Sequence, residues 1–262
     1  MRSFRWRPAL AVALVAAGVV TACETVPYTG RSQLQFMSPQ QESQLGAQAY
    51  QQTLAKARLS SDAAASEMVT RVGSRIAAVT GHPEYKWEYR LIQDDKQVNA
   101  FALPGGKVAV YTGILPVTRD ENGLAAVLGH EIGHVIARHG GERVSQQMLV
   151  NVGLETTMAA LSRGNPATVQ AVAALLGAGA TVGVLLPWSR AQESEADHLG
   201  LILMAKAGYD PHAARDLWVR MAAASKGSGK PPEFLSTHPS EPTRIKQIDA
   251  WMPEAMQYFR PR

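Results

Sequence analysis

The spacing of apolar and polar residues predicts a chain that is mainly helical. Apolar residues recur three and four positions apart along several segments, as on the buried face of a helix. Capping residues mark helix starts, as at Ser38-Pro39 and Asp210-Pro211, and glycines mark two of the ends. Helices are expected at residues 38–59, 62–79, 120–140, 189–201, 210–224 and 242–251.

Three short segments have the pattern of β-strands. Residues 85–92 alternate between apolar and polar side chains, and residues 99–103 and 107–112 flank the turn Pro104-Gly105-Gly106. The expected fold class is therefore α+β and mostly helical, with a small mixed β-sheet beside the helix at 120–140. Residues 38–262 are expected to form a single domain.

One apolar region, residues 146–187, leaves three interpretations open. It could form a transmembrane hairpin, or a pair of buried helices broken at residues 163–166. The buried pair is favoured, because Gln170 and the many glycines and alanines would make a weak membrane span. The third interpretation is a mobile flap over a cleft, or a segment that faces a membrane.

Residues 1–22 have the pattern of a signal peptide. Three arginines precede an apolar stretch at 8–20, which is short for a membrane helix, and small residues then lead to Cys23 as in a bacterial lipobox. Cleavage before Cys23 would expose a thiol for lipidation, so a lipid anchor would hold the chain on a membrane. Residues 23–37 would follow as a polar leader. The alternative is an ordinary signal peptide or N-terminal anchor with an incidental cysteine.

The residue after the cysteine predicts the location. Glu24 stands there in place of aspartate, which by resemblance to bacterial sorting rules indicates the outer membrane of the bacterial cell envelope, facing the periplasm.

Charge and cysteine content narrow the function classes. The chain carries a formal charge of +4, but three of its 26 basic residues lie in the predicted signal peptide, which leaves 23 basic against 22 acidic residues. No basic cluster with interleaved aromatic residues is found, so nucleic-acid binding is not expected. Cys23 is the only cysteine, so an intramolecular disulfide is excluded.

The pentapeptide His130-Glu131-Ile132-Gly133-His134 indicates metal chemistry. Residues four apart lie on the same face of a helix, so both imidazoles can point at one metal ion. Glu131 lies about a quarter turn away, where it can reach a water molecule on the metal. Two nitrogen ligands, an open coordination position and a carboxylate base are what zinc-dependent hydrolysis requires.

The third ligand has to come from elsewhere in the chain. A histidine ten residues after the first is ruled out, because position 140 is glycine; His139 would point away from the pair and is expected to be structural. The remaining candidate is Glu193, on the next predicted helix. Asp197 lies one turn further along the same face and can accept a hydrogen bond from a ligand imidazole.

Each pattern has an ordinary alternative. A glutamate and an aspartate four apart usually mark a solvated helix face, and the pentapeptide alone can occur by chance. However, residues 124–128 are apolar, so the histidines lie on a buried helix, where unpaired polar groups are costly. The two patterns together therefore favour a metal site with one Zn²⁺ per chain.

Several motifs resemble the zinc metallopeptidases of the HtpX-like and CAAX-prenyl-protease type, which are gluzincins. These motifs are Asn99-Ala100-Phe101-Ala102-Leu103-Pro104-Gly105-Gly106, the stretch from Ser189 to Asp197, and Thr237-His238-Pro239 with Arg244-Ile245. The resemblance covers about residues 39–248 and is strongest to lipoprotein members of the bacterial envelope. It implies a gluzincin-like zinc metalloprotease domain that acts in protein quality control.

The expected reaction is hydrolysis of peptide bonds in unfolded or misassembled envelope proteins, with Glu131 as the general base. His238 is a candidate donor to the oxyanion, or, by resemblance to some family members, a removable ligand that closes the metal site. An edge strand containing Asn99, Ala100 and Phe101 could bind a polypeptide by main-chain pairing.

Two other function classes stay open at this point. One is a chaperone-like or binding lipoprotein whose zinc site is structural or closed by His238. The other is an interaction protein in which the pentapeptide is accidental. Glu131 favours the enzyme, since a purely structural zinc site has no use for a general base. The sequence does not indicate the physiological substrate or the oligomeric state.

Overall fold

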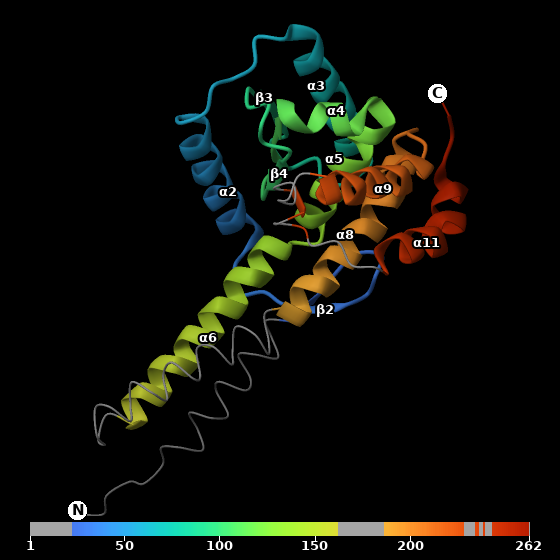
Figure 1. The fold of residues 1–262 in the computed structure, drawn as a ribbon. Coiled ribbons are helices and arrows are strands. Elements are labelled where there is room, and N and C mark those ends of the chain that lie inside the picture. Colours follow the sequence, from blue (N-terminus) through green and yellow to red (C-terminus); the bar gives the residue numbers. More distant parts are fainter. Residues whose placement is uncertain (1–22, 162–185, 228–233, 236–237, 239–242, 262) are drawn as a thin grey trace, which may run out of the picture.

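The computed structural model describes residues 23–161, 186–227, 234–235, 238 and 243–261. At its centre lies α5 (Glu121–Ile136), buried on nearly all sides. It packs along α8 (Leu186–Lys206), and the two helices cross near the middle of the molecule (Figure 1). The expected class, a mostly helical α+β fold with a small mixed sheet, is confirmed.

Glycines allow α5 and α8 to approach closely. A Cβ atom added at Gly129 would lie 2.8 Å from the carbonyl oxygen of Gly200, and one at Gly133 would lie 2.9 Å from that of Ala196. Any larger residue at these positions would therefore force the helices apart. This close crossing places residues of α8 directly beside His130 and His134.

The sheet lies on the other side of α5. Its strand order is β3 (Glu88–Ile92), β5 (Lys107–Tyr111) and β4 (Ala100–Leu103), with β3 parallel and β4 antiparallel to β5. β4 is thus an outer strand, and it contacts α5.

Helices cover both faces of the sheet and complete the core. α3 (Ala63–Ala77) packs on β3 and α5, and α2 (Pro39–Leu54) covers the opposite face, where the Tyr50 hydroxyl donates to the Val108 carbonyl at 3.0 Å. Beyond the sheet, α9 (His212–Gly227) and α11 (Arg244–Tyr258) pack against α5 and α8. A 3-10 turn, η1 (Thr112–Ile114), and a short helix, α4 (Leu115–Thr118), lead from β5 into α5.

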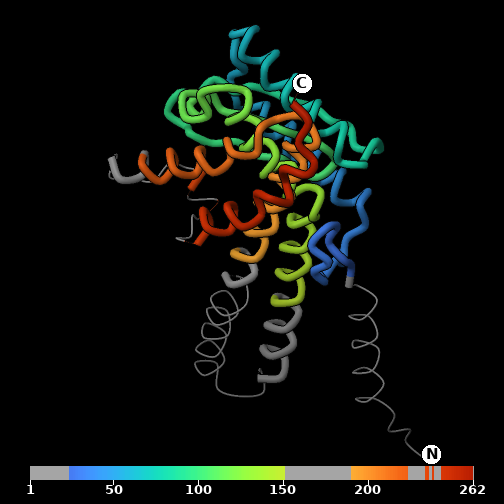
Figure 2. Tube along the Cα trace, turned by 90° about the vertical axis from the view of Figure 1, so that its right-hand side faces the viewer, coloured from blue at the N-terminus to red at the C-terminus, as the bar shows by residue number. Residues whose placement is uncertain are grey.

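The residues expected to form a polar leader are folded onto the domain. β1 (Cys23–Thr25) and β2 (Ser32–Leu34) form an antiparallel hairpin, and Val26 and Gln33 are almost completely buried. In both views the hairpin, in blue, lies at the base of α6 (Figures 1 and 2). Residues 1–22 lie outside the described residues, so the signal peptide and the lipidation of Cys23 stay predictions.

The helix expected to run from 120 to 140 is two helices. α5 ends at Ile136, Arg138 adopts a left-handed conformation with φ of 56°, and α6 (His139–Leu161) then starts in a new direction. α6 projects away from the body of the domain beside the start of α8 (Figure 2).

Other bounds differ from the expected ones by a few residues. α8 begins at Leu186, so Ser189 lies inside the helix rather than at its cap, and α11 continues through Pro253 to Tyr258. Of the apolar region at 146–187, residues 162–185 lie outside the described part of the chain. Within the described residues, no helix combines the length and apolar character needed to cross a membrane.

Candidate metal centre

The crossing of α5 and α8 brings the three predicted metal ligands together. The Nε2 atoms of His130 and His134 are 3.2 Å apart. The carboxylate of Glu193 lies between them, 3.4 Å from Nε2 of His130 and 3.3 Å from Nε2 of His134. All three side chains are largely buried, so a tight group of nitrogen and oxygen donors is held away from bulk water.

His238 joins this group as a fourth donor. Its Nδ1 lies 3.1 Å from Nε2 of His130 and 3.1 Å from the Glu193 carboxylate. The backbone N–H of His238 donates to the carbonyl of Phe234 at 2.8 Å, and the two rings pack together. Within the described residues, these four side chains offer ligand atoms that all lie within 4.8 Å of one another.

Behind His130, a carboxylate and a guanidinium fix the ring. Nδ1 of His130 lies 2.9 Å from Asp197, and Arg244 of α11 forms an ion pair with Asp197 at 2.7 Å. Arg244 in turn stacks on the ring of Trp218, with its Cζ 3.4 Å from the ring centre. Because Asp197 accepts from Nδ1, the imidazole keeps Nε2 free for a metal ion.

Behind His134 lies a second set of residues, which the sequence did not indicate. Nδ1 of His134 is 2.8 Å from Nδ1 of His139, and Nε2 of His139 is 2.9 Å from Glu195. His139 points towards His134 because the chain turns at Arg138. A continuous helix would have directed it away, so no pattern in the sequence could have found this contact.

Glu131 lines the same site without joining the donor group. Its Oε2 accepts a hydrogen bond from the backbone N–H of Ala102 at 3.3 Å, and its Oε1 lies 3.2 Å from Nε2 of His238. Burial raises the pKa of the Glu131 carboxyl above its usual range. A carboxylate with a raised pKa is suited to accept a proton near neutral pH and to return it.

The other titratable groups are shifted in directions that follow from their surroundings. Burial opposes the charge on His130, but hydrogen bonds to Asp197 and Glu193 outweigh it and raise its pKa to about 9. Burial lowers the pKa of His134. Burial also opposes the charge on Glu193, yet hydrogen bonds from the three histidines hold its pKa well below the usual range.

A cavity of about 230 Å³ opens onto this centre. One wall is β4, and the other is formed by α5 and the start of α6. Of the predicted edge strand, Phe101 lines the cavity, whereas Asn99 is buried and its side chain accepts from the N–H of Ala100. Glu131, His134 and His238 also line the cavity, so a polypeptide lying along β4 would pass the donor group.

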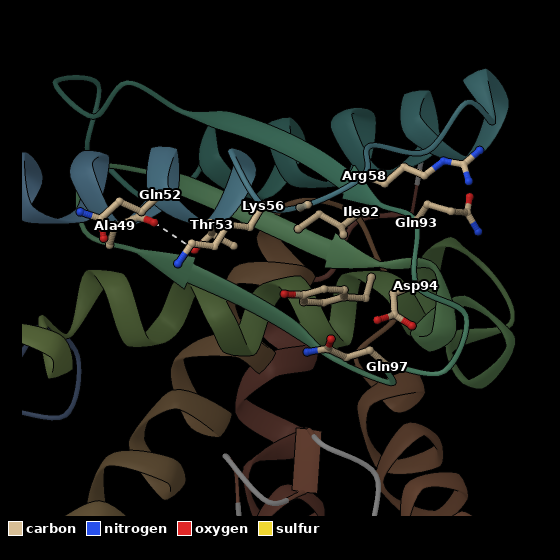
Figure 3. A pocket seen from close by; sticks show the side chains of 11 residues that line it. Ala49, Gln52, Thr53, Lys56, Arg58, Ile92, Gln93, Asp94 and Gln97 are labelled. Carbon is tan, nitrogen blue, oxygen red and sulfur yellow. Dashed lines mark hydrogen bonds between the residues drawn. The ribbon is translucent and has the colours of Figure 1, made fainter.

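A larger hollow of about 570 Å³ lies on the far face of the sheet, between the end of α2 and the ends of β3 and β5 (Figure 3). Asp94 is the one carboxylate among its lining residues, and Lys56 and Arg58 are the cations. No group of metal ligands faces it, so the chemistry of the donors, rather than the size of the hollow, locates the functional site.

Comparison with known proteins agrees with this geometry. The sequence profile of peptidase family M48 matches residues 63–252, which include all four donors of the centre. The predicted resemblance to zinc metallopeptidases is thereby confirmed at the level of this family. The assignment to the HtpX-like and CAAX-prenyl-protease type and to a lipoprotein branch stays a prediction.

The similar curated proteins are peptidases. Mitochondrial metalloendopeptidase OMA1 of Schizosaccharomyces pombe is 40% identical over 97% of this chain and 74% of that protein. The OMA1 of Saccharomyces cerevisiae is 35% identical over 66% of this chain and 49% of that protein. The beta-barrel assembly-enhancing protease of Yersinia pestis is 31% identical over 87% of this chain and 47% of that protein. The chain thus spans about half the length of the last two.

The expected location in a bacterial outer membrane is contradicted by these relatives. The OMA1 proteins of fission yeast, budding yeast and Arabidopsis thaliana are all named as mitochondrial. Residues 1–22 contain three arginines and no acidic residue. Arginines without acidic residues also occur in mitochondrial transit peptides, so this feature alone could not distinguish the two locations.

Proposed function

The chain belongs to peptidase family M48, and on that basis we propose that it is a zinc-dependent endopeptidase that cleaves unfolded or misassembled polypeptides. The observation that carries the proposal is the set of four donors, His130, His134, Glu193 and His238, gathered within 4.8 Å. The general prediction of a metalloendopeptidase is confirmed by the family and its relatives.

The donor set fits zinc in both chemistry and spacing. Imidazole and carboxylate are ligands that zinc prefers, at bond lengths of about 2.0–2.2 Å in a tetrahedral arrangement. Four ligands at that distance stand about 3.3–3.6 Å from one another. Contacts among the four side chains measure 3.1–3.4 Å, and their ligand atoms all lie within 4.8 Å of one another, so the group is close enough to hold one small ion.

A zinc ion held there supplies Lewis acidity and makes water a nucleophile near neutral pH. The protein's part in the reaction falls to Glu131, which accepts the proton of the attacking water and passes it to the leaving amine. The N–H of Ala102 donates to Oε2 of Glu131 and holds the carboxylate towards the cavity. Asp197 keeps the His130 ring in the orientation that the metal requires.

β4 provides the surface on which a substrate would lie. It is the outer strand of the sheet, it lines the cavity, and Ala102 contacts the general base. A polypeptide added to this edge is recognised through its main chain, which favours unfolded segments of varied sequence. A peptide substrate with alternate backbone amides methylated should be cleaved more slowly than its parent; equal rates would rule out strand addition.

His238 occupies the position that an attacking water needs. Its Nδ1 stands among the other three donors, and its Nε2 faces Glu131, so the ring separates the base from the metal position. Of the two predicted roles for His238, this placement favours the removable ligand over the oxyanion donor. We infer that His238 must swing away before a substrate can react.

Removing the His238 side chain is expected to increase activity. If the open state is normally populated at 10% or less, His238→Ala should speed cleavage of casein about ten-fold or more, measured with excess Zn²⁺. The matched control is His212→Ala, because His212 is exposed and lies outside the cavity. Slower cleavage by His238→Ala would contradict the removable ligand and support the oxyanion donor.

Metal removal tests the proposed function as a whole. The purified chain should carry about one Zn²⁺ and cleave casein; a chelator should abolish cleavage, and one equivalent of Zn²⁺ should restore it. Metal content is measured by atomic absorption, and cleavage by release of soluble peptides. A folded chain that binds no zinc would contradict the proposed zinc-dependent function.

The position of His238 also favours a second candidate, a chaperone-like binding protein whose zinc site stays closed. It shares the metal site with the enzyme and differs only in turnover. A zinc-loaded chain that binds unfolded casein, with no cleavage even after His238→Ala, would establish this second function.

A further inference from the structure

The N-terminal hairpin reaches the metal centre through a chain of buried polar groups. Arg31 lies between β1 and β2, and its guanidinium bridges two acidic residues of different helices. It donates to the Glu142 carboxylate at 2.7 and 2.8 Å and to Glu195 at 2.9 Å. Glu142 is completely buried and Glu195 is 5% exposed, so this cation balances two buried charges, to which Gln192 and Thr29 also donate hydrogen bonds.

A zinc ion on Nε2 of His134 would set the hydrogen positions along this chain. His134 presents Nε2 to the other metal ligands, so its Nδ1 carries the hydrogen and donates to Nδ1 of His139. His139 then carries its hydrogen on Nε2 and donates to Glu195. A charged carboxylate at Glu195 thus fixes the tautomer of both rings, and Arg31 supplies the charge that stabilises it.

The groups behind His134 repeat the arrangement behind His130, with one additional imidazole ring. Behind His130, the order is imidazole, Asp197 and Arg244. Behind His134, it is imidazole, His139, Glu195 and Arg31. Loss of an orienting group of this kind typically weakens metal affinity by about 10- to 100-fold. The groups behind His134 end at Arg31, in the N-terminal hairpin, which is otherwise remote from the site.

Apolar and charged contacts together dock the hairpin, in which Val26 and Leu34 are buried. Val26 belongs to a small apolar cluster with Ala137 and Leu199. Glu24 pairs with Arg138, and Tyr28 accepts a hydrogen bond from Lys206 at 2.8 Å. These contacts hold the hairpin without touching the residues behind His134.

We propose that Arg31 is a positioning residue for His134, acting through Glu195 and His139, so that the docked hairpin forms part of the metal centre. This inference rests on the proposed zinc site. It makes the affinity for metal depend on a segment more than 90 residues before the first ligand.

The test compares zinc affinities by competition with a chromogenic chelator. Arg31→Gln should weaken Zn²⁺ binding about 10- to 100-fold, the usual effect of losing an orienting group. It should also change the visible absorption of the Co²⁺-loaded chain, which reports ligand geometry. The matched control, Lys206→Met, loosens the hairpin elsewhere and should leave both readouts unchanged.

A second pair of variants separates positioning from general loosening. If Arg31 acts through His139, the double variant Arg31→Gln/His139→Phe should bind Zn²⁺ no more weakly than His139→Phe alone. Arg31→Lys keeps the charge with a single nitrogen to serve two carboxylates, so an intermediate affinity is expected; this variant replaces Arg31→Gln if the latter does not fold.

Two results would overturn the inference: zinc affinity of the folded Arg31 variants within two-fold of wild type, or additive losses in the double variant. Failure of the wild-type chain itself to bind zinc would instead remove the proposed function.

Discussion

Replacing Glu131 by glutamine is expected to reduce casein cleavage by about 10²- to 10⁴-fold, the usual contribution of a general base. Glutamine has nearly the same shape as glutamate but cannot accept the proton of the attacking water. Glu131 is not among the four donors, so the variant should still bind one Zn²⁺. The measurement pairs peptide release with metal content on the same preparation.

The matched control is Glu121→Gln, the same substitution in the first turn of α5. Glu121 pairs with Arg71 on the surface at 2.6 Å, far from the donors along the same helix. Its removal should leave cleavage within about two-fold of wild type, since exposed ion pairs contribute little. Equal cleavage by Glu131→Gln and wild type would contradict the assignment of the base, even with zinc bound.

Replacing Arg244 by methionine is expected to destabilise the metal-free chain by about 3–5 kcal/mol, the cost of leaving a buried charge unpaired. Arg244 is 4% exposed and contacts Asp197 through two nitrogens, at 2.5 and 2.7 Å. It also lies 3.5 Å from Glu193, so two buried carboxylates would lose their cation. Denaturant unfolding, followed by circular dichroism, measures the change.

Two further variants make the Arg244 result specific. Arg215→Met breaks a half-exposed ion pair with Asp249 and should cost less than about 1 kcal/mol. Adding Asp197→Asn to Arg244→Met removes one unpaired charge, so part of the lost stability should return. A loss for Arg244→Met no larger than that for Arg215→Met would show that the buried pair does not stabilise the fold.

How far the site could be predicted varies from residue to residue. His130, Glu131 and His134 were predicted because their relation is local: four residues along one helix fix two rings on the same face, whatever surrounds the helix. Glu193 required an assumption about packing, since it meets the histidines only where α5 crosses α8. The glycines that permit this crossing are visible in the sequence, but their partners are not.

His139 shows where local patterns fail. The sequence favoured a helix continuing to residue 140, in which this ring would face away from the ligands. The turn at Arg138 depends on a left-handed backbone conformation at a residue that rarely adopts one. Such a conformation persists only because surrounding contacts hold it, including the ion pair between Arg138 and Glu42 at 2.6 Å.

The amino-acid sequence by itself determined the helical character of this chain, its small sheet, and the spacing of the two histidines and glutamate to which we assign its chemistry, because each follows from periodicity or spacing within one element. Only the tertiary structure decided that His238 stands among the ligands and that residues 23–37 are folded. Buried Val26 and Leu34 hold that segment together with ion pairs such as that of Arg31 with Glu142, 111 positions away. Contacts between residues so far apart leave no periodic trace in the sequence.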